Sequence, residues 1–440
     1  MLHFIKNVLR KVLPQNSINI LKALSLYIKG ITFKLTLIRT NAKHKKALKQ
    51  IKSKSKIRVV FFLIHHTAWK YEGVYRLMER DKRFDPIVLI CPFITLGHDF
   101  MTKVMNQSFD TFKKNGYQVI KALDETTGIW LNVKEEINPE IVCFTNPWNI
   151  TRPEYQIRNF LDTLTCYVPY GYETSHLHEA YYNGEMMNLV WKFFIENNIH
   201  KELSRKYSRN NSTNVVVTGY PGMDKFLIGG FSPRDVWKLK DKKFKRIIWA
   251  AHHTIPGLGA SLDYSTFLDY SEVMLQFADQ FKEDIQIAFK PHPKLRENLS
   301  KDEVWGKLKT DEYYQKWSEL DNGQLEEGEY LDLFFTSDAL IHDCGSFVVE
   351  YLYTGKPVLY LFRDDQITER FNEVGKMALS KFYSGKNNHD IEKFINEVVI
   401  GNRDSLKEER NYFFESVIKP PNNITASENI FKSIVSEISN

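Results

Sequence analysis

Residues 332–362 read DLFFTSDALIHDCGSFVVEYLYTGKPVLYLF, and this stretch predicts the architecture of the second half of the chain. Residues 339–342 form a short apolar run, which is typical of a buried strand. Residues 343–346 have the composition of a tight turn, and residues 347–353 carry apolar side chains at helical spacing. Residues 358–362 are a second strand-like run. The order strand, turn, helix, strand predicts a parallel βαβ unit.

The turn of this unit is a candidate site for an anion. It lies at the carboxyl end of the predicted strand, where parallel α/β sheets bind their ligands. A helix that begins at Ser346 would direct its free backbone N–H groups and its positive dipole end at the turn, which suits a phosphate. A structural alternative stays open, in which Asp343 and Ser346 only cap the helix.

These residues resemble a known family signature. In the CDP-glycerol glycerophosphotransferases, the teichoic-acid polymerase family, a strand ends in an Asp-Tyr-Ser-Ser turn that is followed by a helix and a Pro-led strand. Asp343, Ser346 and Pro357 match this pattern, whereas Cys344 and Gly345 replace the Tyr and the first Ser. The glycine still allows the backbone to approach a phosphate closely. The resemblance implies a GT-B fold and a CDP-activated polyol donor bound near this turn.

The charge of the chain is unevenly distributed. The 440 residues carry a formal net charge of +6, but residues 1–56 hold 14 Lys or Arg and no acid. Residues 57–440 therefore carry a net charge of −8. The hydrophobic content of 43% indicates a globular body. A reducing cytosol is favoured because no disulfide or zinc spacing relates the four cysteines, which are Cys91, Cys143, Cys166 and Cys344.

Residues 1–56 predict a basic amphipathic helical arm. Lysines interrupt its apolar residues, so no run of about 18 apolar residues predicts a membrane-spanning helix. No signal-peptide pattern is present either. Interleaved basic and apolar residues favour a peripheral position on the anionic cytoplasmic face of the cell membrane. The alternative is a solvated arm that packs on its own domain. Nucleic acid is not an expected partner, because the body is acidic and lacks a recognition motif.

Two α/β domains follow the arm. Residues 57–225 and residues 226–420 each alternate strand-like runs with helical patterns, which predicts a doubly wound sheet in each, and residues 421–440 predict a closing helix. Two such domains facing a cleft are the GT-B architecture that the resemblance implies. Strands are expected at 57–64, 87–91, 117–120, 141–144, 166–168, 215–218, 246–251, 285–290, 339–342 and 358–362. Helices are expected at 100–115, 153–163, 266–282, 347–353, 389–399, 404–417 and 425–438, and a charged connection at 296–330.

Two further loops of the second domain are candidates for the phosphate site. The Lys-Pro-His-Pro segment 290–293 ends a predicted strand, and its prolines restrict the loop that carries Lys290 and His292. A cation beside an imidazole suits a diphosphate, and the family carries a basic residue and a His-Pro pair at this place. His252 and His253 follow the first strand of the domain and are either phosphate ligands or ordinary loop residues.

Residues 219–224 resemble the family's Gly-Tyr-Pro-Arg-x-Asp segment at the end of the first domain. Gly222 replaces the Arg. The resemblance implies a role in the geometry of the interdomain cleft for the residues that match: Gly219, Tyr220, Pro221 and Asp224.

The first domain is expected to supply the catalytic base. The family's Trp-His-Gly-Thr-Pro motif, whose His is thought to act as base, is absent, and residues 168–176 are its nearest counterpart by position. A base must reach the acceptor hydroxyl and titrate near neutrality, which suits histidine. The sequence leaves four histidines open: His65, His66, His176 and His178.

No metal or cofactor is expected. The sequence has no Asp-x-Asp pair, no Gly-x-Gly-x-x-Gly loop and no Walker loop, so catalysis would depend on side chains and helix dipoles. The resemblance implies transfer of glycerol phosphate, or a similar polyol phosphate, from a CDP-activated donor to a hydroxyl of a cell-surface polymer or lipid-linked primer, with release of CMP. Two alternatives stay open: a GT-B glycosyltransferase that uses a nucleotide sugar for capsule or envelope polysaccharide, and a non-catalytic scaffold of an envelope-polymer complex.

Overall fold

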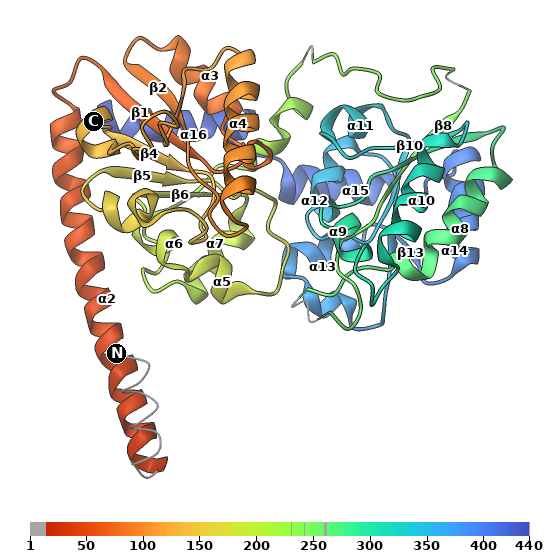
Figure 1. The fold of residues 1–440 in the computed structure, drawn as a ribbon, viewed down its shortest axis with the longest axis horizontal. Helices are drawn as coiled ribbons and strands as arrows, with labels where there is room; N and C mark the ends of the chain where they lie inside the picture. Colours follow the sequence, from red (N-terminus) through yellow and green to blue (C-terminus); the bar gives the residue numbers. More distant parts are fainter. Residues whose placement is uncertain (1–14, 230, 242, 259–261, 440) are drawn as a thin grey trace.

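The computed structural model describes residues 15–229, 231–241, 243–258 and 262–439. Their strands form two sheets, one in each half of the chain (Figure 1). The first sheet is parallel throughout and has the order β3-β2-β1-β4-β5-β6-β7. Its strands are β1 (Ile57–Leu63), β2 (Phe84–Ile90), β3 (Val119–Lys121), β4 (Ile141–Phe144), β5 (Leu164–Tyr167), β6 (Lys192–Ile195) and β7 (Val215–Val217).

The second sheet is also parallel, with the order β10-β9-β8-β11-β12-β13. In both sheets the strand order reverses beside the first strand, which confirms the doubly wound, GT-B-like fold that the sequence predicted. The strands of the second sheet are β8 (Lys245–Ala250), β9 (Ile285–Phe289), β10 (Gly323–Leu325), β11 (Ala339–His342), β12 (Val358–Leu361) and β13 (Tyr383–Gly385).

Helices connect the strands. The α-helices are α2 (Gln15–Ile51), α3 (Glu72–Arg80), α4 (His98–Lys114), α5 (His178–Tyr182), α6 (Glu185–Leu189), α7 (Asn198–Tyr207), α8 (Phe267–Gln280), α9 (Leu295–Leu299), α10 (Gly306–Glu319), α11 (Leu331–Thr336), α12 (Phe347–Glu350), α13 (Glu373–Leu379), α14 (Asn388–Lys393), α15 (Lys407–Phe413) and α16 (Ala426–Ser439). Shorter 3-10 or π segments are η1 (His66–Ala68), η2 (Val133–Ile137), η3 (Pro153–Tyr155), η4 (Ile157–Phe160), η5 (Pro221–Phe226), η6 (Tyr351–Thr354), η7 (Ile367–Arg370), η8 (Phe394–Ile400), η9 (Phe414–Ile418) and η10 (Pro421–Asn423).

Each sheet has an apolar core on both faces. Successive side chains of a strand point to opposite faces, so alternate residues of β1 enter different cores. Val60 and Phe62 lie in one core of the first domain, and Val59, Phe61 and Leu63 lie in the other. This explains why six of the seven residues of β1 are apolar, rather than every second one; its one polar residue, Arg58, is exposed.

Three of the predicted segments differ from the observed secondary structure, and the strands β6 and β13 are not among the predicted ones. Residues 153–163 form two 3-10 turns instead of a helix, because Gln156 is extended (φ −99°, ψ 160°) between them. Residues 296–330 contain α10 and β10 instead of an irregular connection. The helix expected at 347–353 is a four-residue α-helix continued by a 3-10 turn, so its dipole is small.

Helix α2 is the described part of the predicted arm; residues 1–14 lie outside the described residues. It runs along the first domain and projects beyond it (Figure 1). Phe33, Leu37 and His44 on one side of α2 are buried against the domain. None of the described helices is long and apolar enough to cross a bilayer. Apolar side chains on the other side of α2 are exposed: Tyr27, Ile28, Ile31, Leu35 and Ile38.

The chain ends in the first domain. After the second sheet, α16 returns and packs beside α3, where Ile430, Ile434 and Ile438 are buried in one core of the first domain (Figure 1). Asp224, at the end of the first domain, accepts backbone N–H bonds from Ala426 and Ser427, both at 2.9 Å. The first domain therefore includes segments from both halves of the chain. The bonds to Asp224 fix the start of α16, where the chain has crossed back from the second domain to the first.

Candidate active site

A cavity of about 740 Å³ lies between the two domains. The carboxyl ends of β9 and β11 supply its second-domain wall, as expected for ligand sites of parallel sheets. The loop after β5 supplies much of the first-domain wall. Among the residues that line it are His66, Lys70, Tyr170, Glu173, Thr174, His252, Tyr264, Lys290, His292, Gly345, Ser346 and Glu350.

Lys290 is the buried cation of this cavity. Its side chain is only 7% exposed, and its Nζ has no hydrogen bond or ion pair with any described residue. Its backbone N–H donates to the carbonyl of Trp249 at 2.8 Å, which continues the β8–β9 pairing to the cavity. Burial lowers the pKa of Lys290. The charges of Glu326, Glu329 and Glu327 raise this pKa against burial, but none of them forms an ion pair with Nζ. An anion in the cavity would give this buried ammonium group a direct counter-ion.

The turn after β11 presents free polar groups beside Lys290. Ser346 is in the αR conformation and its hydroxyl makes no capping bond within the described part of the chain. The backbone N–H groups of Gly345 and Ser346 donate to no acceptor there either. A methyl group added to Gly345 would lie 3.6 Å from Tyr264 and 3.7 Å from Thr174, so the glycine opens space between the domains. The Ser346 hydroxyl therefore does not cap the helix, and its role in binding an anion stays a prediction.

Asp343 has a different place from the one that the resemblance implied. Its carboxylate is buried and does not line the cavity. One oxygen accepts the N–H of His252 at 2.6 Å, and the other accepts the N–H and hydroxyl of Thr266 at 2.6 and 2.9 Å. Burial raises the pKa of Asp343 to about 6. The residue ties the turn after β11 to the loop after β8 and to the start of α8, so we assign it a positioning role.

Three imidazoles cluster beside the turn. The ring centroid of His253 lies 4.2 Å from that of His252 and 4.1 Å from that of His292. Burial lowers the pKa of His292 to about 3 and that of His253 to about 4, and it also lowers the pKa of His252. Nδ1 of His292 accepts the N–H of Lys294, which assigns the proton of the neutral ring to Nε2. His292 and His252 line the cavity, whereas His253 lies behind them.

One of the four candidate bases lines the cavity. This is His66, in η1, whose Nδ1 is buried without a hydrogen-bond partner among the described residues. His65 instead contacts the hydroxyl of Thr67 through Nδ1 at 2.8 Å, and burial lowers its pKa to about 4. His176 is exposed and contacts the carbonyl of Arg370 at 3.0 Å, and His178 stacks on Tyr207. These three side chains lie outside the cavity wall.

Glu173 is a site residue that sequence reasoning missed. Oε1 accepts the N–H of Ser175 at 2.6 Å, while Oε2 has no partner among the described residues and is not enclosed by protein. The side chain lines the cavity, and burial raises its pKa well above the usual range. Asn372 of the second domain donates to the carbonyls of Glu173 (3.0 Å) and Thr174 (2.7 Å). These two bonds hold the segment against the second domain.

Two other carboxylates of the cavity accept hydrogen bonds. Glu350 accepts the N–H of Tyr172 and the hydroxyl of Tyr330, and Glu196 accepts the N–H of Glu173. Glu329 also lines the cavity, and its carboxylate has no partner among the described residues. In the part of the chain that the structure describes, no three His, Cys, Asp or Glu side chains are grouped to hold a metal ion.

The 219–224 segment shapes the crossover between the domains. Gly219 has φ +90°, and a Cβ there would lie 2.6 Å from Pro420, so only glycine fits. Tyr220 is buried against Tyr172, with ring centroids 5.5 Å apart. Asp224 holds the start of α16, and burial raises its pKa to about 6. None of these side chains lines the main cavity; Pro221 and Asp224 line a neighbouring one.

Comparison with known proteins decides the family. The family described as CDP-Glycerol:Poly(glycerophosphate) glycerophosphotransferase matches residues 173–436, which is more than half of the chain. The chain belongs to this family. The match confirms the family resemblance and the class of enzyme that the sequence indicated, a CDP-glycerol glycerophosphotransferase-like transferase. The match begins at Glu173 and includes every residue assigned above to the second-domain wall. A search of curated proteins gave no match.

Solved structures share the fold of this glycerophosphotransferase family member. The wall teichoic acid polymerase TagF is 13% identical, with 93% of this chain and 98% of that chain covered and a TM-score of 0.54. A putative UDP-N-acetylglucosamine 2-epimerase from Listeria monocytogenes is 15% identical, with 87% and 96% covered and a TM-score of 0.54. MnaA of S. aureus, solved with UDP, is 16% identical, with 87% and 98% covered and a TM-score of 0.51.

Proposed function

We propose that the protein transfers glycerol phosphate, or a similar polyol phosphate, from a CDP-activated donor to a hydroxyl of a teichoic-acid-like surface polymer or its lipid-linked primer, with release of CMP. The observation that carries the proposal is the buried, unpaired Lys290 beside the free N–H groups of the turn after β11. Together with His292 and Ser346, it offers a diphosphate one cation and several hydrogen-bond donors at one wall of the cavity.

The transfer requires one bond to form and one to break. The acceptor oxygen attacks the phosphorus that carries the polyol, and the bond from that phosphorus to the oxygen bridging the two phosphates breaks. The electron pair leaves with CMP. Lys290 and the N–H of His292 would stabilise the charge that develops on the leaving phosphate. Because these groups are held on strand ends, their geometry is set before the donor binds.

Two first-domain groups would serve the acceptor side. His66 is the candidate base, because it is the predicted histidine that lines the cavity and a neutral imidazole can take the hydroxyl proton. Glu173 would act in its protonated form, because burial raises its pKa and a diphosphate nearby would raise it further. A neutral carboxyl group can donate a hydrogen bond to a phosphate oxygen without repelling the donor.

The nucleotide donor that the protein uses distinguishes the proposed transfer from the two alternatives. Purified protein should show a higher melting temperature with CDP-glycerol or CDP-ribitol than with UDP-N-acetylglucosamine, and it should release CMP when a primer is supplied. The same assay in EDTA should keep its rate, which tests the expectation of metal independence. A glycosidic product from the nucleotide sugar would establish the glycosyltransferase alternative instead. Binding of every nucleotide without turnover would support the scaffold alternative.

We propose further that α2 holds the enzyme peripherally on an anionic membrane surface, at its cytoplasmic face. The exposed apolar side chains of α2 listed above fall within about a third of the helix circumference, opposite the side that packs on the domain. Lys45, Lys46 and Lys49 continue the same face and are exposed. Each basic residue near an anionic surface contributes about 1 kcal/mol to the free energy of membrane binding. The exposed apolar side chains would add to this by inserting into the membrane interface.

The double change Ile31→Glu and Leu35→Glu should abolish most sedimentation with phosphatidylglycerol vesicles without changing the melting temperature. These positions are exposed, so their replacement costs no core packing, whereas deletion of the whole arm would uncover Phe33 and Leu37. Leu308→Glu, at an exposed leucine of α10, is the matched control and should sediment like the unmodified protein. Equal sedimentation of the double variant would exclude the stripe as the membrane contact.

A further inference from the structure

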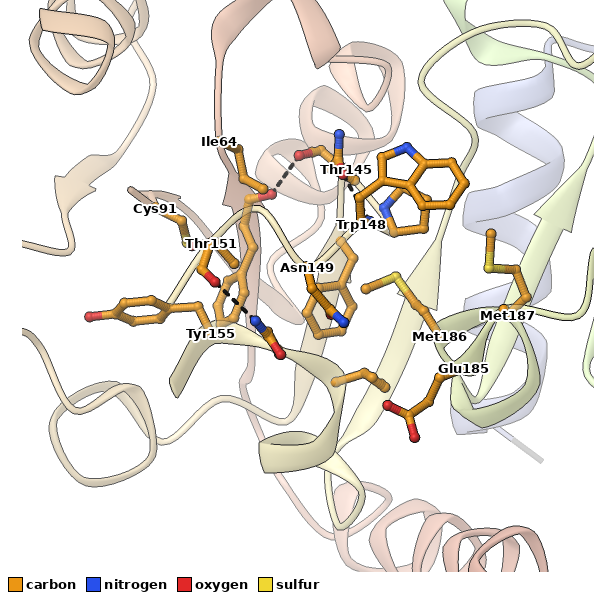
Figure 2. A pocket seen from close by; sticks show the side chains of 17 residues that line it. Ile64, Cys91, Thr145, Trp148, Asn149, Thr151, Tyr155, Glu185, Met186 and Met187 are labelled. Carbon is orange, nitrogen blue, oxygen red and sulfur yellow. Dashed lines mark hydrogen bonds between the residues drawn. The ribbon is translucent and has the colours of Figure 1, made fainter. Parts of the chain in front are cut away.

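A second, smaller cavity of about 180 Å³ lies in the first domain (Figure 2). It is found at the carboxyl ends of β1 and β4, the edge of the sheet where ligands bind. Figure 2 shows Trp148 and Asn149 on one side of it, Glu185, Met186 and Met187 on another, and Thr151 and Tyr155 on a third. A cavity of this size suits a small molecule such as one sugar ring or polyol.

The lining of this cavity is mostly apolar, with a few polar side chains and no basic one. None of the 17 described residues that line it is Lys, Arg or His. The single acid, Glu185, is paired with Arg158 outside the cavity. A phosphate would find no counter-charge here, whereas hydroxyl groups need only hydrogen-bond donors and acceptors beside an apolar surface.

Free hydrogen-bonding groups border the cavity. Asn146 is 6% exposed; its Oδ1 accepts the N–H of Trp148 at 2.9 Å, but its Nδ2 has no partner among the described residues. The Nε2–H of Gln156 donates to the carbonyl of Thr151 at 2.9 Å, and its Oε1 accepts no hydrogen bond from the described residues. Asn149 is exposed, and its side-chain amide makes no hydrogen bond with the described residues. The buried Asn146 and the half-buried Gln156 each keep one free amide end that a bound polar molecule would complete.

The cavity adjoins the donor site. Met187 lines both cavities. The indole Nε1 of Trp148 donates to the hydroxyl of Tyr170 at 3.1 Å, and the Trp148 ring meets Tyr181 edge to face with centroids 5.9 Å apart. Tyr170 and Tyr181 line the main cavity. A molecule bound in the small cavity is therefore separated from the main one by Trp148 and its two tyrosine contacts.

We propose that this cavity binds a neutral sugar or polyol unit of the acceptor, with Trp148 as its apolar wall and Asn146, Asn149 and Gln156 as its hydrogen-bonding groups. This inference rests on the proposed function, because it places the acceptor of that transfer. Because Trp148 separates this cavity from the donor site, the bound unit lies next to the end that reacts and is not that end itself. The acceptor therefore contains an uncharged unit, and a reaction that adds such a unit, such as a sugar transfer to the primer, must come before this step.

Saturation-transfer NMR with the full-length protein tests the site. The probes are N-acetylglucosamine, glucose and glycerol 3-phosphate at millimolar concentration. A neutral sugar should bind, and glycerol 3-phosphate should not displace it. Asn149→Ala should weaken sugar binding by about three- to tenfold, the effect of one lost hydrogen bond, without changing the melting temperature. Asn388→Ala removes another exposed asparagine side chain, on α14, and should leave sugar binding unchanged.

The outcomes separate this inference from the proposed function. No binding of either sugar, binding that survives Asn149→Ala, or displacement by glycerol 3-phosphate would each overturn the acceptor assignment. None of these results depends on the donor. Conversely, failure to use any CDP-activated polyol would overturn the proposed function while sugar binding, measured without a donor, could still be observed.

Discussion

Replacing Lys290 by methionine should weaken binding of a CDP-activated donor by roughly ten- to a hundredfold, the effect expected for loss of a charge-assisted hydrogen bond. The melting temperature of the free protein should stay the same or rise, because the lysine is a buried cation without a partner among the described residues and methionine fills similar space. Calorimetric titration and thermal unfolding on the same samples measure both quantities. If Lys290 served only stability, Lys290→Met would lower the melting temperature and leave donor affinity unchanged.

The pH dependence of donor binding follows from the same residue. Burial lowers the pKa of Lys290, so the free protein loses this charge at a lower pH than an exposed lysine would. Affinity that depends on the ammonium group is fully present below the lowered pKa and falls as the pH rises through it. Lys290→Arg should remove that fall, because guanidinium stays charged. Lys294→Met, at the exposed neighbour, is the control. Unchanged affinity in Lys290→Met would exclude the proposed diphosphate site.

The sheets could be predicted because their strands are buried on both faces. β1 and β11 appear in the sequence as mostly apolar runs, with Arg58 and His342 as their polar residues, and the reversal of strand order follows from parallel βαβ connections. Short or mixed elements could not be predicted in this way. The strand β10 has the sequence Gly-Gln-Leu, and the pattern at 153–163 resembles a helix although its backbone is extended at Gln156.

The candidate site could be predicted in part. Lys290, His292 and Ser346 lie on one wall because they follow β9 and β11, two strands of one parallel sheet that both pair with β8. Strand ends do not specify side-chain direction, so nothing in the sequence indicated that Asp343 faces Thr266 or that His253 lies behind His292. Glu173 could not be predicted as a residue of the site, because its hydrogen bond with Asn372 joins residues that are 199 positions apart in the sequence.

His66→Gln should lower the turnover rate by roughly 10²- to 10⁴-fold, the usual contribution of a general base, while donor affinity stays the same. Glu173→Gln should remain within about tenfold of the unmodified enzyme, since glutamine keeps an uncharged hydrogen-bond donor of the same shape. Steady-state turnover and donor titration separate the two effects. His389→Gln, at an exposed histidine of α14, is the control for loss of an imidazole and should keep full activity.

The pH profile distinguishes the two first-domain groups. Burial, reinforced by the charge of Glu196, raises the pKa of Glu173, so its proton is present at low pH and lost as the pH rises through that raised pKa. If the protonated form assists transfer, the unmodified enzyme loses activity on the alkaline side and Glu173→Gln removes this loss. If the carboxylate were the base, activity would instead rise with pH through the same pKa. In that case Glu173→Gln would nearly abolish turnover and His66→Gln would not, which would reassign the base to Glu173.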